Sequence, residues 1–129
     1  MFAFRRKRAL LLDDDAAMRR LASLLLKRAG YSVDAVVSGN DAIDAIENQQ
    51  YTAILLDLMM PLEGGMTVIR YLRENAPEML RRVIVITGAP DAVLDPIRDE
   101  IFAVVRKPFH HGDLIETAKR LAKFSHLSS

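Results

Sequence analysis

Apolar positions recur along the chain in two patterns, one typical of helices and one typical of buried strands. A helical spacing of i, i+3, i+4 and i+7 connects Met18, Leu21, Ala22 and Leu25. Gly30 is expected to end this helix, because glycine readily adopts the left-handed backbone that follows many helices. Similar spacing predicts helices over 40–50, with Asn40 as the N-cap, from about 66 to 75, and over 112–124.

Between these helices lie short, dense apolar runs of strand length. They occupy residues 9–12, 31–37, 51–57, 82–87 and 102–107. Runs without polar alternation are typical of parallel strands that helices cover on both faces. Strands that alternate with helices in this way form βαβ units with right-handed crossovers. We therefore expect an α/β fold, a doubly wound three-layer sandwich.

The segment between the fourth and fifth predicted strands has a weaker helical pattern. Helical spacing connects Val93, Ile97 and Ile101. Pro96 falls within this pattern, and an interior proline costs a helix about 3 kcal/mol. The helix is therefore expected to be short, kinked or restarted at Asp95–Pro96.

Length and composition narrow the class of protein. The chain has 129 residues, so one domain is expected over 1–129, with its core at about 8–124. It has no cysteine, which excludes disulfides, thiolate nucleophiles and cysteine-ligated zinc. No apolar run approaches the roughly 18 residues that span a bilayer, so a cytoplasmic protein without membrane contact is expected. The net charge is +1 and the basic run at 5–8 is short, so no direct nucleic acid binding is expected.

Four of the predicted strands end in a residue that can bind or transfer a charged group. The first ends at Asp13 and Asp14. The third ends at Asp57, the fourth at Thr87 and the fifth at Lys107. In open parallel sheets, ligands bind outside the carboxyl ends of the strands. Each residue alone would be an ordinary loop or surface residue, but together they predict one pocket.

The predicted pocket suits phosphoryl transfer. Converging carboxylates favour a hard divalent cation such as Mg²⁺. Lys107 supplies a positive charge and Thr87 a hydroxyl donor, and both kinds of group stabilise a transferring phosphoryl group. Asp57 stands alone at its strand end and is the best candidate for a nucleophile that forms an aspartyl phosphate. Asp15 is expected to cap the first helix instead.

At these positions the chain resembles the receiver domain of bacterial two-component response regulators. The resemblance rests on the segments "LLLDDD", "AILLDLMMPLEGG", "VIVITG" and "VVRKPF", which occur in order and at normal spacing. It covers essentially the whole chain. It implies a flavodoxin-like sandwich with a five-stranded parallel sheet, strand order 2-1-3-4-5, and five helices.

The resemblance also implies a role for each residue of the pocket. Asp57 would be the phosphoacceptor, and Mg²⁺ would be bound by Asp57 together with Asp14 directly, Asp13 through water and the backbone carbonyl of Met59. Thr87 and Lys107 are similar to the switch hydroxyl and the phosphate-binding lysine of the family. The Lys107–Pro108 peptide bond would be cis.

In the function that this resemblance implies, the chain is a phosphorylation-controlled switch in two-component signal transduction. A sensor histidine kinase or a phosphotransfer protein would supply the phosphoryl group to Asp57. The chain would not be an enzyme beyond catalysing its own phosphorylation and dephosphorylation. A homodimer or a downstream protein would use the face formed by the fourth helix, fifth strand and fifth helix.

The chain departs from the family pattern near the end of the predicted sheet. Receiver domains generally carry Tyr or Phe three residues before the lysine, and this ring turns inward as the hydroxyl residue moves. Here the position is Val104, which is β-branched and has no ring. Phe102 precedes it by two residues, so on a regular strand it would share the same face and could partly substitute.

Two further positions concern the lifetime of the phosphorylated form. In the family, the residues two beyond the phosphoacceptor and two beyond the switch hydroxyl influence the water that attacks the acyl phosphate. Here they are Met59 and Ala89, and neither orients a water by a strong hydrogen bond. The resemblance therefore implies a comparatively long-lived phosphorylated form.

Two other functions remain open from the sequence. An aspartate-nucleophile phosphatase of the haloacid-dehalogenase type also uses Asp, Mg²⁺, Thr and Lys. It usually has a second acid two residues after the nucleophile, which fits Asp13 with Asp15 but not Asp57 with Met59. The other alternative is a receiver-like interaction module that works without phosphorylation.

Overall fold

Five parallel strands form the central layer of the computed structural model, which describes residues 7–61 and 63–128. The strands are β1 (Arg8–Leu12), β2 (Ser32–Val36), β3 (Ala53–Leu56), β4 (Val83–Thr87) and β5 (Ala103–Arg106). Their order in the sheet is β2-β1-β3-β4-β5, and every neighbouring pair is parallel. The predicted flavodoxin-like strand order is confirmed.

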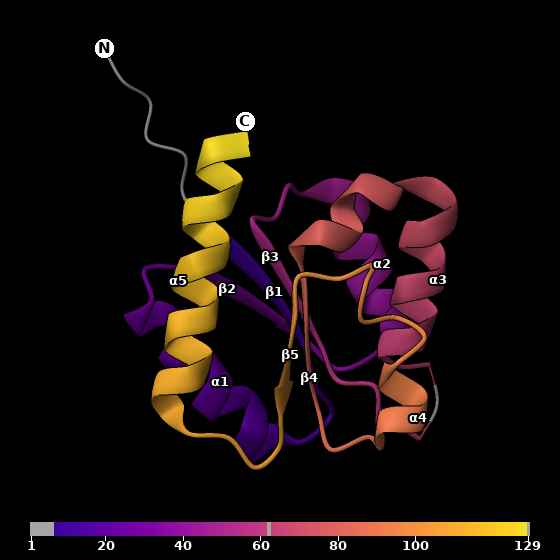
Figure 1. The fold of residues 1–129 in the computed structure, drawn as a ribbon, viewed down its shortest axis with the longest axis horizontal. Coiled ribbons are helices and arrows are strands. Elements are labelled where there is room, and N and C mark those ends of the chain that lie inside the picture. The colour runs from indigo at the N-terminus through magenta and orange to yellow at the C-terminus, as the bar shows by residue number, and fades with distance from the viewer. Residues whose placement is uncertain (1–6, 62, 129) are drawn as a thin grey trace.

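Helices cover both faces of this sheet. They are α1 (Ala16–Arg28), α2 (Gly39–Asn48), α3 (Gly65–Asn75), α4 (Asp91–Leu94) and α5 (His111–Ser128). Figure 1 shows α1 and α5 on one side of the sheet and α2, α3 and α4 on the other. A 3₁₀ helix, η1 (Pro77–Arg82), follows α3 and was not predicted. The three-layer sandwich with five α-helices is confirmed.

The strands send alternate side chains into two separate apolar layers. From β1, Ala9 and Leu11 pack in the layer that contains α1 and α5. Leu10 and Leu12 pack in the layer formed with α2, α3 and α4. Burial of one leucine side chain contributes about 1.5–3 kcal/mol to the stability of the fold. Because helices cover both faces of the sheet, apolar residues on both faces are buried and stabilise it. This two-sided burial is the reason why the central strands read as unbroken apolar runs.

The ends of the first two helices are set by local hydrogen bonds. Asp15 is the N-cap of α1, because its Oδ1 accepts a hydrogen bond from the amide of Met18 at 3.1 Å, as predicted. Gly30 follows the helix with a φ of 94°, also as predicted. The predicted helix over 40–50 is present as α2, but its predicted N-cap was wrong. Ser38 rather than Asn40 is the N-cap, since the Ser38 hydroxyl accepts from the Asp41 amide at 3.1 Å.

The fourth helix is a single turn that ends at Leu94, so the expectation of a short helix is confirmed. The expectation for Phe102 was wrong. The chain bends at 101–102 and β5 begins only at Ala103, so the two-residue alternation does not extend back to Phe102. Phe102 packs in the layer of α1 and α5, whereas Val104 packs in the opposite layer. Phe102 therefore does not replace the missing ring.

Within residues 7–61 and 63–128, no helix combines the length and apolar character required to cross a membrane. Arg5 and Arg6 of the basic run lie outside the described residues. The predicted domain limits at 1 and 129 lie outside them as well and stay a prediction.

Candidate functional site

The parallel register brings the carboxyl ends of four strands to one edge of the sheet. Leu12 of β1 pairs with Leu56 of β3, so the residues that follow them, Asp13 and Asp57, are neighbours. Thr87 ends β4 and pairs with Arg106 of β5, which directly precedes Lys107. The structure thus brings together, at one edge of the sheet, the predicted residues Asp13, Asp57, Thr87 and Lys107.

Lys107 is the centre of this arrangement. Its Nζ donates hydrogen bonds to Asp13 Oδ2 at 2.8 Å and to Asp57 Oδ2 at 3.1 Å. Both carboxylates are buried, with exposed fractions of 2% for Asp13 and 5% for Asp57. Burial lowers the pKa of the Lys107 ammonium, but its hydrogen bonds and charge interactions with Asp13 and Asp57 outweigh burial and raise the pKa above its usual value. Lys107 therefore stays charged.

Asp14 completes an acidic cluster with the two buried carboxylates. One ligand oxygen from each of Asp13, Asp14 and Asp57 lies within 4.8 Å of the others, and Asp14 is exposed. Carboxylates this close repel one another, and a single lysine does not balance three negative charges. Oxygen ligands at this spacing fit a hard divalent cation that keeps part of its water shell, as Mg²⁺ does. The cluster therefore has the chemistry of a metal site.

Local backbone contacts hold the two buried carboxylates in place. Asp13 Oδ1 accepts from the Asp15 amide at 2.9 Å, and Asp57 Oδ1 accepts from the Met59 amide at 2.9 Å. The carbonyl of Asp57 accepts from the Gly65 amide at 2.9 Å. A Cβ on Gly65 would lie 2.6 Å from this carbonyl oxygen, so only glycine allows the close approach.

Thr87 lies fully buried beside the acidic cluster. Its Oγ1 accepts a hydrogen bond from the Ala89 amide at 3.2 Å, and its carbonyl accepts from the Lys107 amide at 3.0 Å. The peptide bond between Lys107 and Pro108 is cis, as predicted. Met59 follows the acidic cluster with an exposed side chain. The role of its carbonyl as a metal ligand stays a prediction.

Sequence reasoning missed two arginines that bind the backbone of the site. Arg19 Nη1 donates to the carbonyl of Asp13 at 3.0 Å, and Arg106 Nη1 donates to the carbonyl of Ala89 at 2.9 Å. Arg19 lies four residues after the N-cap Asp15, and this one-turn spacing could have placed it over the β1–α1 turn. Arg106 had no comparable signal, because its partner belongs to a loop of irregular backbone.

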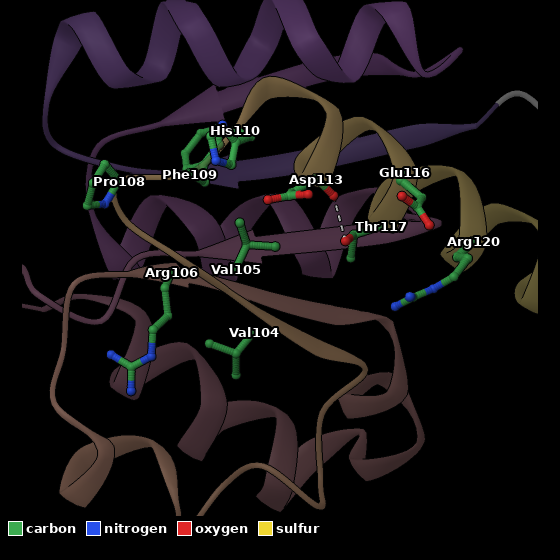
Figure 2. Close-up of a pocket in the computed structure, with 10 residues that line it drawn as sticks. All are labelled: Val104, Val105, Arg106, Pro108, Phe109, His110, Asp113, Glu116, Thr117 and Arg120. Atoms are coloured by element: carbon green, nitrogen blue, oxygen red, sulfur yellow. Dashed lines mark hydrogen bonds between the residues drawn. The ribbon is translucent and has the colours of Figure 1, made fainter.

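A cavity of about 390 Å³ lies beside β5 and α5, apart from the acidic cluster. Figure 2 shows its lining residues, among them Asp113 and Thr117, whose hydroxyl donates to the Asp113 carbonyl at 2.7 Å. None of the predicted site residues lines this cavity. The predicted pocket is therefore the acidic edge of the sheet and not this cavity.

Comparison with known proteins identifies the family. The family model described as the response regulator receiver domain matches residues 9–119. The response regulator receiver protein CpdR of Brucella abortus is 32% identical over 117 residues, which cover 89% of this chain and 96% of CpdR. The transcriptional regulatory protein GltR of Pseudomonas aeruginosa is 31% identical over 116 residues, which cover 88% of this chain and 48% of GltR. The chain belongs to the response regulator receiver domain family.

Solved structures agree with this fold. A signal receiver domain from Vibrio parahaemolyticus superposes with a TM-score of 0.84 at 27% identity, covering 96% of this chain and 95% of that chain. A CheY-like receiver domain from Methanospirillum hungatei superposes with a TM-score of 0.83 at 24% identity, covering 97% of this chain and 100% of that chain. The second likeness supports the flavodoxin-like fold alone.

Proposed function

We propose that this chain accepts a phosphoryl group on Asp57 from the phosphohistidine of a sensor histidine kinase or phosphotransfer protein. The observation that carries the proposal is the placement of the Asp57 carboxylate. One of its oxygens accepts from the Met59 amide and the other from Lys107, and Asp13 and Asp14 lie within reach of the same point. Membership of the receiver family supports the proposal.

In the proposed reaction, an oxygen of Asp57 attacks phosphorus. A P–O bond to the carboxylate forms as the P–N bond to the donor imidazole breaks, and the imidazole leaves with the bonding electron pair. Lys107 carries three N–H donors, so it can bind a phosphoryl oxygen while it remains beside Asp13. The buried Thr87 hydroxyl can donate to another phosphoryl oxygen. Both groups stabilise the charge that builds up on these oxygens.

Mg²⁺ fits this site and would be held by Asp13, Asp14, Asp57 and the carbonyl of Met59. When bound, it supplies positive charge beside the transferring phosphoryl group. In this proposal the chain is a phosphorylation-controlled switch and not an enzyme with separate substrates. Its partner after phosphorylation, a second copy or a downstream protein, would use the face of α4, β5 and α5. The expected cytoplasmic location stays a prediction.

Stoichiometric labelling tests this proposal. Incubation with acetyl phosphate and Mg²⁺ should add one phosphoryl group, detected by intact mass, and Asp57→Asn should abolish the addition. Asp41→Asn is a matched control, because Asp41 is an exposed acid at the start of α2. Equal labelling of wild type and Asp57→Asn would contradict the proposal. Repeated turnover of a generic phosphate ester would favour the phosphatase alternative, and absent labelling would favour the phosphate-independent module.

A further inference from the structure

Arg106 connects β5 to the loop that carries Thr87. Its Nη1 donates to the carbonyl of Ala89 at 2.9 Å, and its Nη2 pairs with the carboxylate of Asp91. Figure 2 shows the Arg106 side chain pointing away from Asp113 and Glu116 of α5. Its two acceptors thus lie on the β4–α4 segment. Val104 cannot provide such a link, because its side chain has no polar group.

The peptide groups around Ala89 are bound on both sides. The Ala89 amide donates to Thr87 Oγ1 at 3.2 Å, and the Ala89 carbonyl accepts from Arg106. Thr87 and Ala89 are both fully buried, which leaves this short loop little freedom to move independently of the Thr87 hydroxyl. Ala89 is therefore the single residue that links the Thr87 hydroxyl to the Arg106 guanidinium.

Asp91 extends the connection into α4. It is the first residue of α4, and its carboxylate binds both Arg106 and Arg98, the latter at 3.0 Å. Arg98 also donates to Asp95 Oδ1 at 3.0 Å, so the contacts run past the end of the helix at Leu94. Within α4 only Leu94 is buried. The polar contacts of Asp91 and Asp95 therefore fix the position of a helix that has four residues and one buried side chain.

We propose that Arg106 is a positioning residue that couples the Thr87 hydroxyl to α4. This inference rests on the proposed phosphorylation of Asp57. A hydroxyl can donate to a phosphoryl oxygen while it still accepts from the Ala89 amide, so Ala89 follows the hydroxyl. The fork of the Arg106 guanidinium then transmits the shift from the Ala89 carbonyl to Asp91. The contacts form one contiguous network from Thr87 to Asp91. Because contiguity alone does not establish coupling, the coupling has to be measured.

Amide chemical shifts measured with beryllofluoride and Mg²⁺ test this coupling. Beryllofluoride stands in for the phosphoryl group on Asp57. In the wild type, shifts should change at Thr87 and Ala89 and also across residues 91–98. In Arg106→Met, the changes at Thr87 and Ala89 should persist and those across 91–98 should be lost. Because exposed ion pairs contribute little to stability, this variant is expected to fold.

Arg98→Met is the matched control. It removes the other arginine bound to Asp91 and leaves the bond between Arg106 and the Ala89 carbonyl intact. Its response across 91–98 should persist. A full response of 91–98 in Arg106→Met, or its loss in Arg98→Met as well, would overturn the inference. If beryllofluoride changed no shift near Asp57 in the wild type, the proposed phosphorylation itself would fail, and the two failures are thereby distinguished.

Discussion

The ammonium of Lys107 lies 2.8 Å from a carboxylate oxygen of Asp13 and also contacts Asp57. Lys107 therefore places a positive charge between two buried carboxylates at one edge of the sheet. Removal of one partner from a buried ion pair leaves an uncompensated charge, which costs about 3 kcal/mol or more. The free energy of unfolding should therefore depend on the positive charge beside these carboxylates, whether Lys107 or a divalent cation supplies it.

Replacement of Lys107 by methionine should lower the free energy of unfolding by about 3 kcal/mol in the absence of divalent cations. Mg²⁺ should restore part of this loss, because it replaces the missing positive charge, and should stabilise the variant more than the wild type. Urea unfolding with and without Mg²⁺ measures both effects. Lys119→Met, at an exposed position of α5, is the control. An equal response of Lys107→Met and wild type to Mg²⁺ would contradict the prediction.

Asp14 and Asp15 should differ in their effect on Mg²⁺ affinity. Asp14 belongs to the acidic cluster, whereas the Asp15 side chain accepts from the Met18 amide at the start of α1. Asp14→Asn should raise the Kd for Mg²⁺ about tenfold or more, equivalent to about 1.4 kcal/mol. Asp15→Asn removes the same charge and keeps the cap, so its Kd should stay close to that of the wild type. Calorimetric titration with Mg²⁺ measures both Kd values. Equal losses of affinity in the two variants would reject Asp14 as a metal ligand.

Met59 should slow the loss of the phosphoryl group. Its amide holds Asp57 Oδ1, and 59% of the residue's surface is exposed at the edge of the site. A thioether does not orient a water as an amide side chain does. Met59→Asn should therefore lose the phosphoryl group faster, by about tenfold if the activation free energy falls by about 1.4 kcal/mol. The decay of the phosphorylated mass over time measures this rate. A slower decay in Met59→Asn than in the wild type would contradict the prediction.

Tyr31 should make the fold sensitive to high pH. Its hydroxyl donates to the Ala118 carbonyl at 2.6 Å, and burial raises its pKa from 10.0 to about 12, against a smaller lowering by the backbone of Ala122. The folded state holds this proton more tightly than the unfolded state. The contribution is therefore fully present below pH 10 and is lost as the pH rises toward 12.

Between pH 9 and pH 11.5 the loss of stability is expected to be about 2 kcal/mol, at about 1.4 kcal/mol per pKa unit. It is smaller than the full effect of the shift because pH 11.5 still lies below the folded pKa. Chemical denaturation of wild type and Tyr31→Phe, at pH 9 and at pH 11.5 (about 0.5 below the folded pKa), measures it. The variant lacks the ionising hydroxyl, so its stability should fall less over the same range. Other groups that titrate there affect both proteins alike. Parallel losses in the two proteins would contradict the assignment to Tyr31.

The sequence allowed prediction of those features that depend on burial and on chain order. β3 and β4 are covered on both faces, so their apolar runs marked them clearly. Polar residues that directly follow β1, β3 and β5 or end β4 then located the acidic edge, because parallel strands share the direction of their ends. Asp57 and Lys107 were found for this reason.

Other features depend on backbone geometry that apolar spacing does not report. Ser38 caps α2 because the chain turns there, two residues before Asn40, which the polar stretch had suggested as the cap. Phe102 faces the opposite layer because the bend at 101–102 interrupts the alternation of the strand. The link from Arg106 to Ala89 joins residues that are 17 positions apart across a loop, so no local spacing indicates it.

The contacts of the acidic edge can form only late in the synthesis of the chain. Asp57 precedes its cation Lys107 by 50 positions, and Asp13 precedes it by 94. In the part of the chain that the structure describes, β5 is an edge strand that pairs with β4 alone, so Lys107 reaches the site only after β5 has docked. A nascent chain on the ribosome thus carries the Asp57 carboxylate before it has the Lys107 ammonium that contacts it. Under the proposed function, a kinase therefore encounters a competent acceptor only on chains that have completed folding through β5.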